Sequence, residues 1–366
     1  MFKFFRQPKE LKGSSLNTLV WKKFRCNFTA MGGLVILLLF VIIAIFGYLI
    51  TPDSTPFANQ QYLEIATLKP GSKVDFLIVP HKQAKKKSWF HKMLFGEPLN
   101  ADAYPIYAHK TEGETLWVEL YTGDTPNDGE WLSFDLGQPH EITSRTFWLG
   151  TDRYGRDLLS QLMIGTRVSL SVGCIAIFIA LLIGIAMGAV GAYFGRWIDN
   201  LIVWIINVVW SIPTILLVIA ITFALGKGFW QVFIAVGLTM WVDVARVVRG
   251  QILSIKEKEF IEAGRALGFK SRRIIFRHIL PNITGPVTVI TASNFATAIL
   301  QEAGLSFLGI GVQPPMPSWG TMIKENAGYL ILDNAYMAIL PGVAIMLLVL
   351  AFMLVGNGLR EAIENQ

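Results

Sequence analysis

The chain has 366 residues, a formal net charge of +6, 53% hydrophobic residues and only 16% charged residues. This composition excludes an ordinary soluble globular domain and is typical of a polytopic membrane protein. A helix needs about 20 apolar residues to cross a hydrocarbon core of about 30 Å, and six stretches meet this need: 32–50, 168–194, 200–224, 230–248, 284–309 and 335–356.

The N-terminal segment, residues 1–31, is basic. Its positive charges ahead of the first span are Lys3, Arg6, Lys9, Lys12, Lys22, Lys23 and Arg25. The positive-inside rule therefore predicts that this segment is cytoplasmic, and six crossings return the tail 357–366 to the same side. The first apolar run is followed by TPDSTP rather than by a small-residue cleavage site, which favours a retained span over a signal peptide.

Residues 51–150 separate the first two spans and have mixed charge with scattered proline and glycine. Two patches in this segment, VDFLIV (74–79) and LWVELY (116–121), alternate as strands do. The sequence predicts a small extracytoplasmic insert that contains some sheet.

The stretch GTDRYGRD (150–157) leads into the second part of the chain and superficially matches a phosphate-binding loop. Such a loop ends in Lys followed by Ser or Thr, which hold the phosphates and magnesium. Arg156 and Asp157 occupy those two places here. We therefore expect that this chain does not bind ATP. From the positions of the apolar stretches, we expect residues 151–356 to form a membrane core with helices 2 to 6.

The second span carries Gly184, Gly188, Gly191 and Gly195 in two overlapping G-x-x-x-G patterns. Small residues at this spacing let helix backbones approach closely. The pattern predicts tight helix contact, either within the chain or at a subunit interface. Pro213 in the third span is expected to kink it, because proline removes one helical hydrogen bond.

Glu302 lies inside the fifth span. A charged side chain deep in lipid costs about 2.5 to 3.5 kcal/mol on insertion scales. We expect Glu302 to face the bundle, a cavity or the outer interface. A structural hydrogen bond and a role in the translocation pathway are both open interpretations.

The basic loop 256–282 lies between the fourth and fifth spans, which the topology makes cytoplasmic. Its first helix, 257–267, has one face formed by Phe260, Ala263, Gly264 and Leu267. Gly268 follows where a left-handed C-cap residue belongs.

A second short helix is expected to begin at a Ser271 cap and to run through Ile274, Ile275 and His278, with Pro281 ending it. This predicts two short helices joined by a glycine turn. They would sit either in a groove of another protein or on anionic lipid headgroups.

The loop sequence EAGRALG (262–268), followed by HILP (278–281), resembles the EAA loop of the membrane subunits of binding-protein-dependent ABC importers. Two more stretches, LGTDRYGRD (149–157) and LSFLGIGVQPPMPSWG (305–320), resemble the second, C-type permease of the dipeptide/oligopeptide/nickel permease family. The resemblance covers most of the chain except about 51–144.

The resemblance implies an all-α polytopic membrane protein with six transmembrane helices of the type I ABC importer permease fold. The insert between helices 1 and 2 would be α+β or β-containing. The resemblance also implies that part of the loop 256–282 docks on an ATPase subunit. The residues concerned are Glu262, Ala263, Gly264, Arg265, Leu267, Gly268, Leu280 and Pro281. Gly264 departs from the general motif, which has alanine at this position. His278 stands where the motif prefers isoleucine, and we interpret it as a packing or capping residue.

By the same resemblance the chain is half of the pathway of an ATP-driven importer for dipeptides, oligopeptides or similar small solutes, in the bacterial inner membrane. Its partners would be a second homologous permease, two ATP-binding cassette ATPase subunits, an extracytoplasmic solute-binding protein, the bilayer and the peptide substrate, with no nucleic acid. The chain would be no enzyme and would hold no cofactor or metal, since ATP and magnesium are used by the partner subunits.

Two other classes of membrane protein remain as alternatives. An ion-coupled secondary transporter normally carries intramembrane charges and an internal repeat, whereas only Glu302 is a candidate charge here and no repeat is visible. An intramembrane enzyme is disfavoured because the sequence has no H-E-x-x-H, no G-x-S-x-G and no Ser/His pair within the spans.

Overall fold

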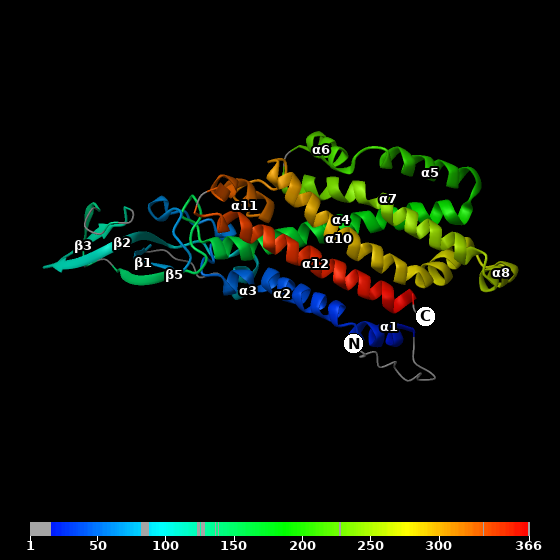
Figure 1. Cartoon of the computed structure of the whole chain (residues 1–366), viewed down its shortest axis with the longest axis horizontal. Helices are drawn as coiled ribbons and strands as arrows, with labels where there is room; N and C mark the ends of the chain where they lie inside the picture. The colour runs from blue at the N-terminus through cyan, green and yellow to red at the C-terminus, as the bar shows by residue number, and fades with distance from the viewer. Residues whose placement is uncertain are drawn as a thin grey trace.

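The computed structural model describes residues 16–81, 88–122, 125, 129–135, 137, 139–226, 228–331 and 333–364. Lys3, Arg6, Lys9 and Lys12, on which part of the topology prediction rests, lie outside the described residues. The long helices run side by side in one bundle, which carries a sheet at one end and the short helix α8 (Glu259–Ala266) at the other (Figure 1). We call these the sheet end and the hairpin end.

The bundle is built mainly from long apolar helices. The helices before α8 are α1 (Leu16–Cys26), α2 (Phe28–Ile50), α4 (Leu158–Phe194), α5 (Arg196–Trp210), α6 (Thr214–Leu225) and α7 (Phe229–Lys256). The helices after α8 are α9 (Ser271–Ile274), α10 (Thr284–Phe307), α11 (Trp319–Asn326) and α12 (Tyr336–Glu364), of which α9 and α11 are short.

Five helical segments in the described part of the chain are long and apolar enough to cross a membrane, and α5 with α6 makes a sixth if this bent pair counts as one span. The predicted all-α polytopic class is thereby confirmed. The second span is longer than predicted because Asp157 caps α4 ten residues earlier, where its carboxylate accepts a hydrogen bond from the Ser160 backbone N–H at 2.9 Å.

The prediction that the third span is one kinked helix over 200–224 is wrong. The chain breaks after Trp210, and α5 and α6 meet at 91°. Pro213 precedes α6 instead of lying inside a helix. After the break, α6 packs on α7. Val218 and Thr222 are the buried residues of α6.

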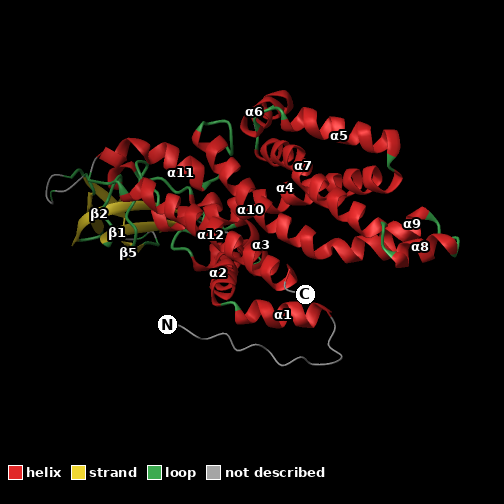
Figure 2. Ribbon diagram, turned by 45° about the vertical axis from the view of Figure 1, so that its right-hand side comes forward, coloured by secondary structure: helices red, strands yellow, loops and turns green. Residues whose placement is uncertain are grey.

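The insert forms a five-stranded antiparallel sheet with the order β4-β3-β2-β1-β5, confined to the sheet end of the molecule (Figure 2). The strands are β1 (Ser72–Pro80), β2 (Ala101–Glu112), β3 (Thr115–Leu120), β4 (Trp131–Asp135) and β5 (Glu141–Phe147), and α3 (Trp89–Phe95) lies between β1 and β2. Both sequence patches expected as strands are confirmed, as β1 and β3. Alternate residues of β1 pack into separate small cores on the two sheet faces.

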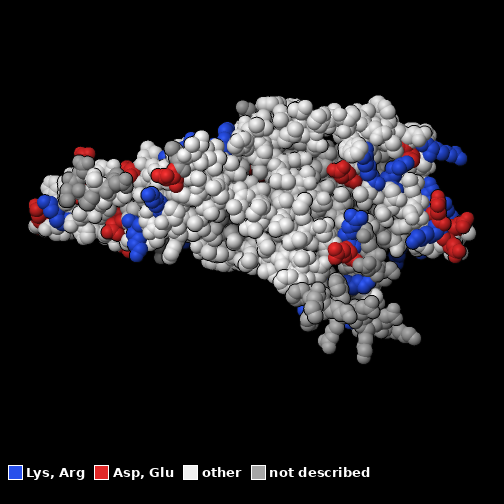
Figure 3. All heavy atoms as spheres, viewed as in Figure 1, with Lys and Arg blue, Asp and Glu red and all other residues white. Residues whose placement is uncertain are grey.

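On the face shown in Figure 3, charged side chains gather towards the two ends of the molecule. Figure 3 shows that the face in view has a band without Lys, Arg, Asp or Glu across the middle of the bundle. This distribution fits a hydrocarbon layer around the bundle, with the sheet end and the hairpin end on opposite sides.

Candidate functional site

The hairpin is formed by α8, the turn at Gly268 and α9. Glu259 and Glu262 lie in the first turn of α8, where carboxylates interact favourably with the helix dipole. Gly268 has φ of +75°, the left-handed conformation predicted for it. Its N–H donates to the Arg265 carbonyl at 2.9 Å, and the Phe269 N–H donates to the Gly264 carbonyl at 3.0 Å. These bonds close α8 and turn the chain back towards the bundle.

The predicted apolar face of α8 divides into two parts in the structure. Phe260, Ala263 and Leu267 are exposed, and we call these three residues the hairpin patch. Gly264 faces the other way, buried, with Phe269 close enough to touch a Cβ placed there. The hairpin patch is thus an apolar surface at the outer end of the hairpin that no other part of the described chain covers.

The hairpin is rigidly attached to the spans. Ile261, Ile274, Ile279 and Ile283 share one buried core with the hairpin-end residues of α7. Because this core is continuous, a force applied to the hairpin is transmitted to α7 and α10.

Aromatic stacking closes the inner side of the turn. The Phe269 and His278 rings stack with their centroids 5.7 Å apart, and the Arg273 guanidinium lies 4.0 Å from the Phe269 ring centroid. His278 therefore occupies a packed position in the structure, beside the turn at Gly268.

The second helix differs from its prediction at both ends. Lys270, not Ser271, is the N-cap residue of α9, and no side chain caps it. Pro281 does not end the helix, because a π-helical turn (Ile275–Ile279) and a 3₁₀ turn (Leu280–Ile283) lead directly into α10. The Leu280 N–H donates to the Ile275 carbonyl, and Pro281 then stands at the start of a turn, where its missing N–H costs nothing.

The predicted coupling residues thus fall into three settings. Glu262, Ala263, Arg265 and Leu267 are exposed along α8, and Gly268 is exposed at the turn. Gly264 is buried. Leu280 packs against the core cluster, while Pro281 lies exposed at the base of α10.

Glu302 is completely buried near the sheet-end terminus of α10. Its Oε1 accepts a hydrogen bond from the Ser306 hydroxyl at 2.7 Å, and Ser306 Oγ in turn accepts from the Val312 N–H at 3.1 Å. The Ser169 and Ser318 side chains lie beside the same carboxyl group. Glu302 is thereby set among hydroxyls from α4, α10 and the 305–320 segment.

The glycines of α4 lie against helices of the same chain. A Cβ at Gly184 would come within 2.7 Å of the Trp241 carbonyl oxygen, and one at Gly188 within 2.7 Å of the Ala245 carbonyl oxygen, both on α7. Gly191 lies against α5, and Gly195 ends α4 with φ of +65°. The spacing is used for close packing of α4 on α7, and for the turn into α5.

Sequence reasoning missed a buried ionic cluster at the sheet end. The Arg156 guanidinium is 2.6 Å from an Asp152 carboxylate oxygen and 2.7 Å from a Glu325 carboxylate oxygen. Burial lowers the pKa of Arg156, but the two adjacent carboxylates outweigh it and raise the pKa above its ordinary value, so the group stays charged. The cluster joins the end of the insert to α11.

The only sequence signal for this cluster is the stretch LGTDRYGRD itself, which also anchors the insert. The Thr67 N–H donates to the Asp152 carbonyl at 3.0 Å, and the Thr151 hydroxyl donates to the Ile65 carbonyl at 2.5 Å. The motif is therefore a structural joint between the insert and the membrane helices.

Comparison with known families matches two parts of the chain. Residues 180–366 match the family described as the binding-protein-dependent transport system inner membrane component. Residues 15–70 match the N-terminal transmembrane domain of oligopeptide transport permease C.

Curated relatives agree with these matches. A dipeptide transport system permease protein of Alkalihalophilus pseudofirmus is 42% identical over 60% of this chain and 72% of its own length. A glutathione transport system permease protein of Pectobacterium atrosepticum is 39% identical over 63% of this chain and 76% of its own length. A solved chain of the MetNI methionine ABC transporter, in an inward-facing conformation, is similar at 20% identity with a TM-score of 0.48, over 56% of this chain and 97% of that chain. The chain belongs to the family of inner membrane components of binding-protein-dependent transport systems, and within it to the C-type permeases.

Proposed function

We propose that this chain is one half of the translocation pathway of an ATP-driven importer, and that the hairpin patch is where an ATPase subunit binds. The observation that carries the proposal is the hairpin itself. An exposed apolar patch within an EAA-type sequence stands on a rigid element that is continuous with α7 and α10. A lipid surface, which the basic residues of the loop would favour, is the alternative. The EAA-type sequence at the hairpin favours the ATPase subunit instead.

In this proposal the hairpin end and both termini face the cytoplasm. Residues 1–31 form a cytoplasmic segment, 32–50 the first transmembrane helix and 51–150 the extracytoplasmic insert. Residues 151–356 form the permease core with the coupling loop at 256–282, and 357–366 a cytoplasmic tail. The basic loop 256–282 supports this orientation through the positive-inside rule.

The complete importer would contain a second homologous permease, two ATPase subunits and an extracytoplasmic solute-binding protein. ATP binding would close the ATPase pair and draw the two hairpins together. The attached spans would then tilt from an inward-facing to an outward-facing arrangement. ATP and magnesium are used by the ATPase subunits, and this chain supplies geometry rather than bond chemistry.

A peptide substrate is supported by the relatives, whose names specify dipeptide and glutathione transport. The insert supports docking of a binding protein at the sheet end, because hydrogen bonds through residues 65–68 and 151–152 hold it fixed over the helices. We propose that Glu302 holds α10 to the 305–320 segment. We also propose that the α4 glycines serve packing inside the chain.

The turn at Gly268 provides the first test of this proposal. Gly268→Val should reduce the ATPase that co-purifies with the chain from native membranes in mild detergent, since a left-handed conformation costs an ordinary residue about 1 to 2 kcal/mol and a β-branched residue is worse suited still. Gly268→Asn is the matched control, because asparagine tolerates this conformation and the Cβ site is open space.

Two results would count against the proposal. Recovery of equal ATPase with the Val and Asn variants would remove the hairpin from the interface. Recovery of no ATPase even with the wild-type chain, in membranes where it still transports solute, would contradict an ATP-driven importer.

A further inference from the structure

The helix α3 of the insert exposes aromatic side chains on more than one side. Its sequence, WFHKMLF, contains a single charged residue, Lys92. Trp89, Phe90 and Phe95 are 62%, 58% and 61% exposed. Because successive residues of a helix are turned by about 100°, these three rings do not share one face. A helix that is apolar on several sides suits a protein core or a membrane rather than water.

Arg167 of α4 fixes the level of α3 relative to the spans. Its Nη1 donates to the Leu94 carbonyl at 2.7 Å and to the Met93 carbonyl at 3.4 Å, so it binds the last turn of α3. The sequence has no further charged residue between Arg167 and Arg196, which follows α4. Charged side chains of a spanning helix lie near the ends of the hydrocarbon layer. Arg167 therefore marks the sheet-end edge of this layer, and the last turn of α3 lies beside that edge.

The segment that follows α2 holds α3 at the same level. Asp53 is the first charged residue after α2, and the carbonyl of the adjacent Ser54 accepts a hydrogen bond from the Glu97 N–H at 2.9 Å. Leu94 lines a cavity together with Ala44, which lies in the last two turns of α2. The helix α3 therefore packs against the side of a spanning helix, close to where that helix ends (Figures 1 and 2).

The surroundings of α3 are those of a surface that faces lipid. The neighbouring helix α2 exposes apolar side chains along its length, among them Leu39, Ile42 and Phe46. Lys92 forms an ion pair with Glu97 at 3.2 Å, so α3 carries no unpaired charge that would oppose contact with lipid. Tryptophan is favoured at the boundary between hydrocarbon and water. The exposed rings of α3 thus continue the apolar surface of α2 up to the edge of the hydrocarbon layer.

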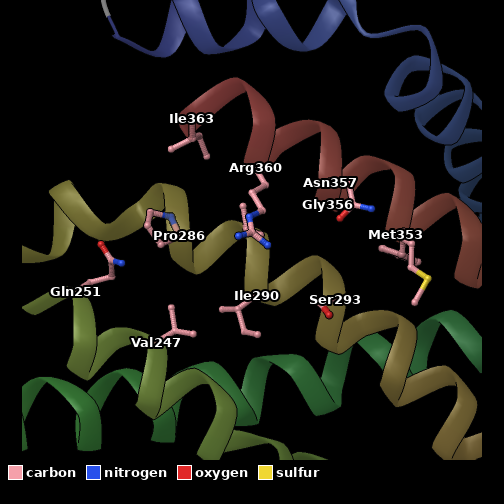
Figure 4. Close-up of a pocket in the computed structure, with 12 residues that line it drawn as sticks. Val247, Gln251, Pro286, Ile290, Ser293, Met353, Gly356, Asn357, Arg360 and Ile363 are labelled. Carbon is pink, nitrogen blue, oxygen red and sulfur yellow. The ribbon is translucent and has the colours of Figure 1, made fainter. Parts of the chain in front are cut away.

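We propose that α3 is immersed in the lipid leaflet at the sheet end, with Trp89, Phe90 and Phe95 in contact with lipid. The insert is thereby attached to the membrane directly, as well as to the bundle through Arg167 and Ser54. The cavity of about 670 Å³ between α7, α10 and α12 is a separate feature, since its described lining residues all come from those three helices (Figure 4). The proposal is independent of the import function, because it requires only the chain and its bilayer.

The test measures the surroundings of a nitroxide spin label on α3, in the full chain reconstituted into phospholipid vesicles. Cys26→Ala and Cys174→Ala remove the two cysteines of the chain, and Phe90→Cys then provides the labelling site. Oxygen concentrates in hydrocarbon and a nickel chelate stays in water, so the ratio of their collision rates with the label distinguishes lipid from water. Phe46→Cys on α2 is the lipid reference at a similar level, and Thr111→Cys, exposed near the end of β2, is the aqueous control.

We expect the oxygen-to-nickel ratio at Phe90 to match that at Phe46 and to exceed that at Thr111. Trp89→Cys, on another side of the helix, should give the same result. A ratio at either α3 position equal to that at Thr111 would show that α3 lies in water and would overturn the proposal. A label shielded from both oxygen and nickel would also overturn it, because a protein surface, such as a second copy of this chain, would then cover the helix.

Discussion

Leu267→Asp is expected to weaken binding of the ATPase subunit to this chain by at least about 30-fold without unfolding the chain. The side chain is 72% exposed within the hairpin patch, so the substitution leaves the chain's own core untouched. At an interface, the same position would bring an unpaired carboxylate into an apolar groove. Losing an anchor residue of this kind costs about 2 to 4 kcal/mol, and every 1.4 kcal/mol is about a factor of ten in affinity.

The measurement is a titration of the purified permease complex with labelled ATPase subunit. Leu63→Asp is the matched control, since Leu63 is also an exposed leucine, at 68%, but lies in the insert at the sheet end. The control should bind the ATPase as wild type does. Equal affinities for the two variants would show that the hairpin patch does not contact the ATPase.

Arg156→Met is expected to cause the largest loss of stability among single substitutions outside the spans. The Arg156 side chain is 7% exposed and bridges Asp152 and Glu325, whose side chains are 3% and 14% exposed. Removing the cation leaves two carboxylates close together without their partner. Breaking a buried ion pair from one side costs about 3 to 5 kcal/mol, so the unfolding midpoint in detergent should fall clearly.

Two further variants make the Arg156 result specific. Arg153→Met changes an exposed arginine in the same loop and should alter stability by no more than about 0.5 kcal/mol. Adding Asp152→Asn and Glu325→Gln to Arg156→Met removes the uncompensated charges and should recover part of the loss. A midpoint for Arg156→Met equal to that of Arg153→Met would rule out the cluster as a stabilising joint.

The features that the sequence predicted correctly are those set by local physical chemistry. Apolar length locates the five spans that are single helices, because a helix must be long enough to cross the hydrocarbon layer. Alternation identifies β1 and β3. The turn at Gly268 was predictable because glycine follows a run of helix-forming residues. A glycine at this position closes a helix in the left-handed conformation, which Gly268 adopts.

The features that it missed depend on partners far away in the chain. Arg156 and Glu325 are separated by 169 positions. The stretch LGTDRYGRD marks the position of Arg156, but it does not identify Glu325 as the partner. The 91° bend before α6 follows from packing on α7, whereas Pro213 by itself is equally compatible with a mild kink. The helix continues through Pro281 because the π-helical turn before it changes the hydrogen-bond register, which composition does not reveal.

We propose that solute import through this chain is coupled to ATP hydrolysis, and reconstituted uptake tests this coupling most directly. The purified complex would be placed in proteoliposomes with ATP at the hairpin face and a solute-loaded binding protein at the insert face, and accumulation of a labelled dipeptide measured. We predict uptake that requires ATP, continues in the presence of a protonophore and is lost with Leu267→Asp. Uptake that continues without ATP and is abolished by the protonophore would contradict this account and identify an ion-coupled carrier.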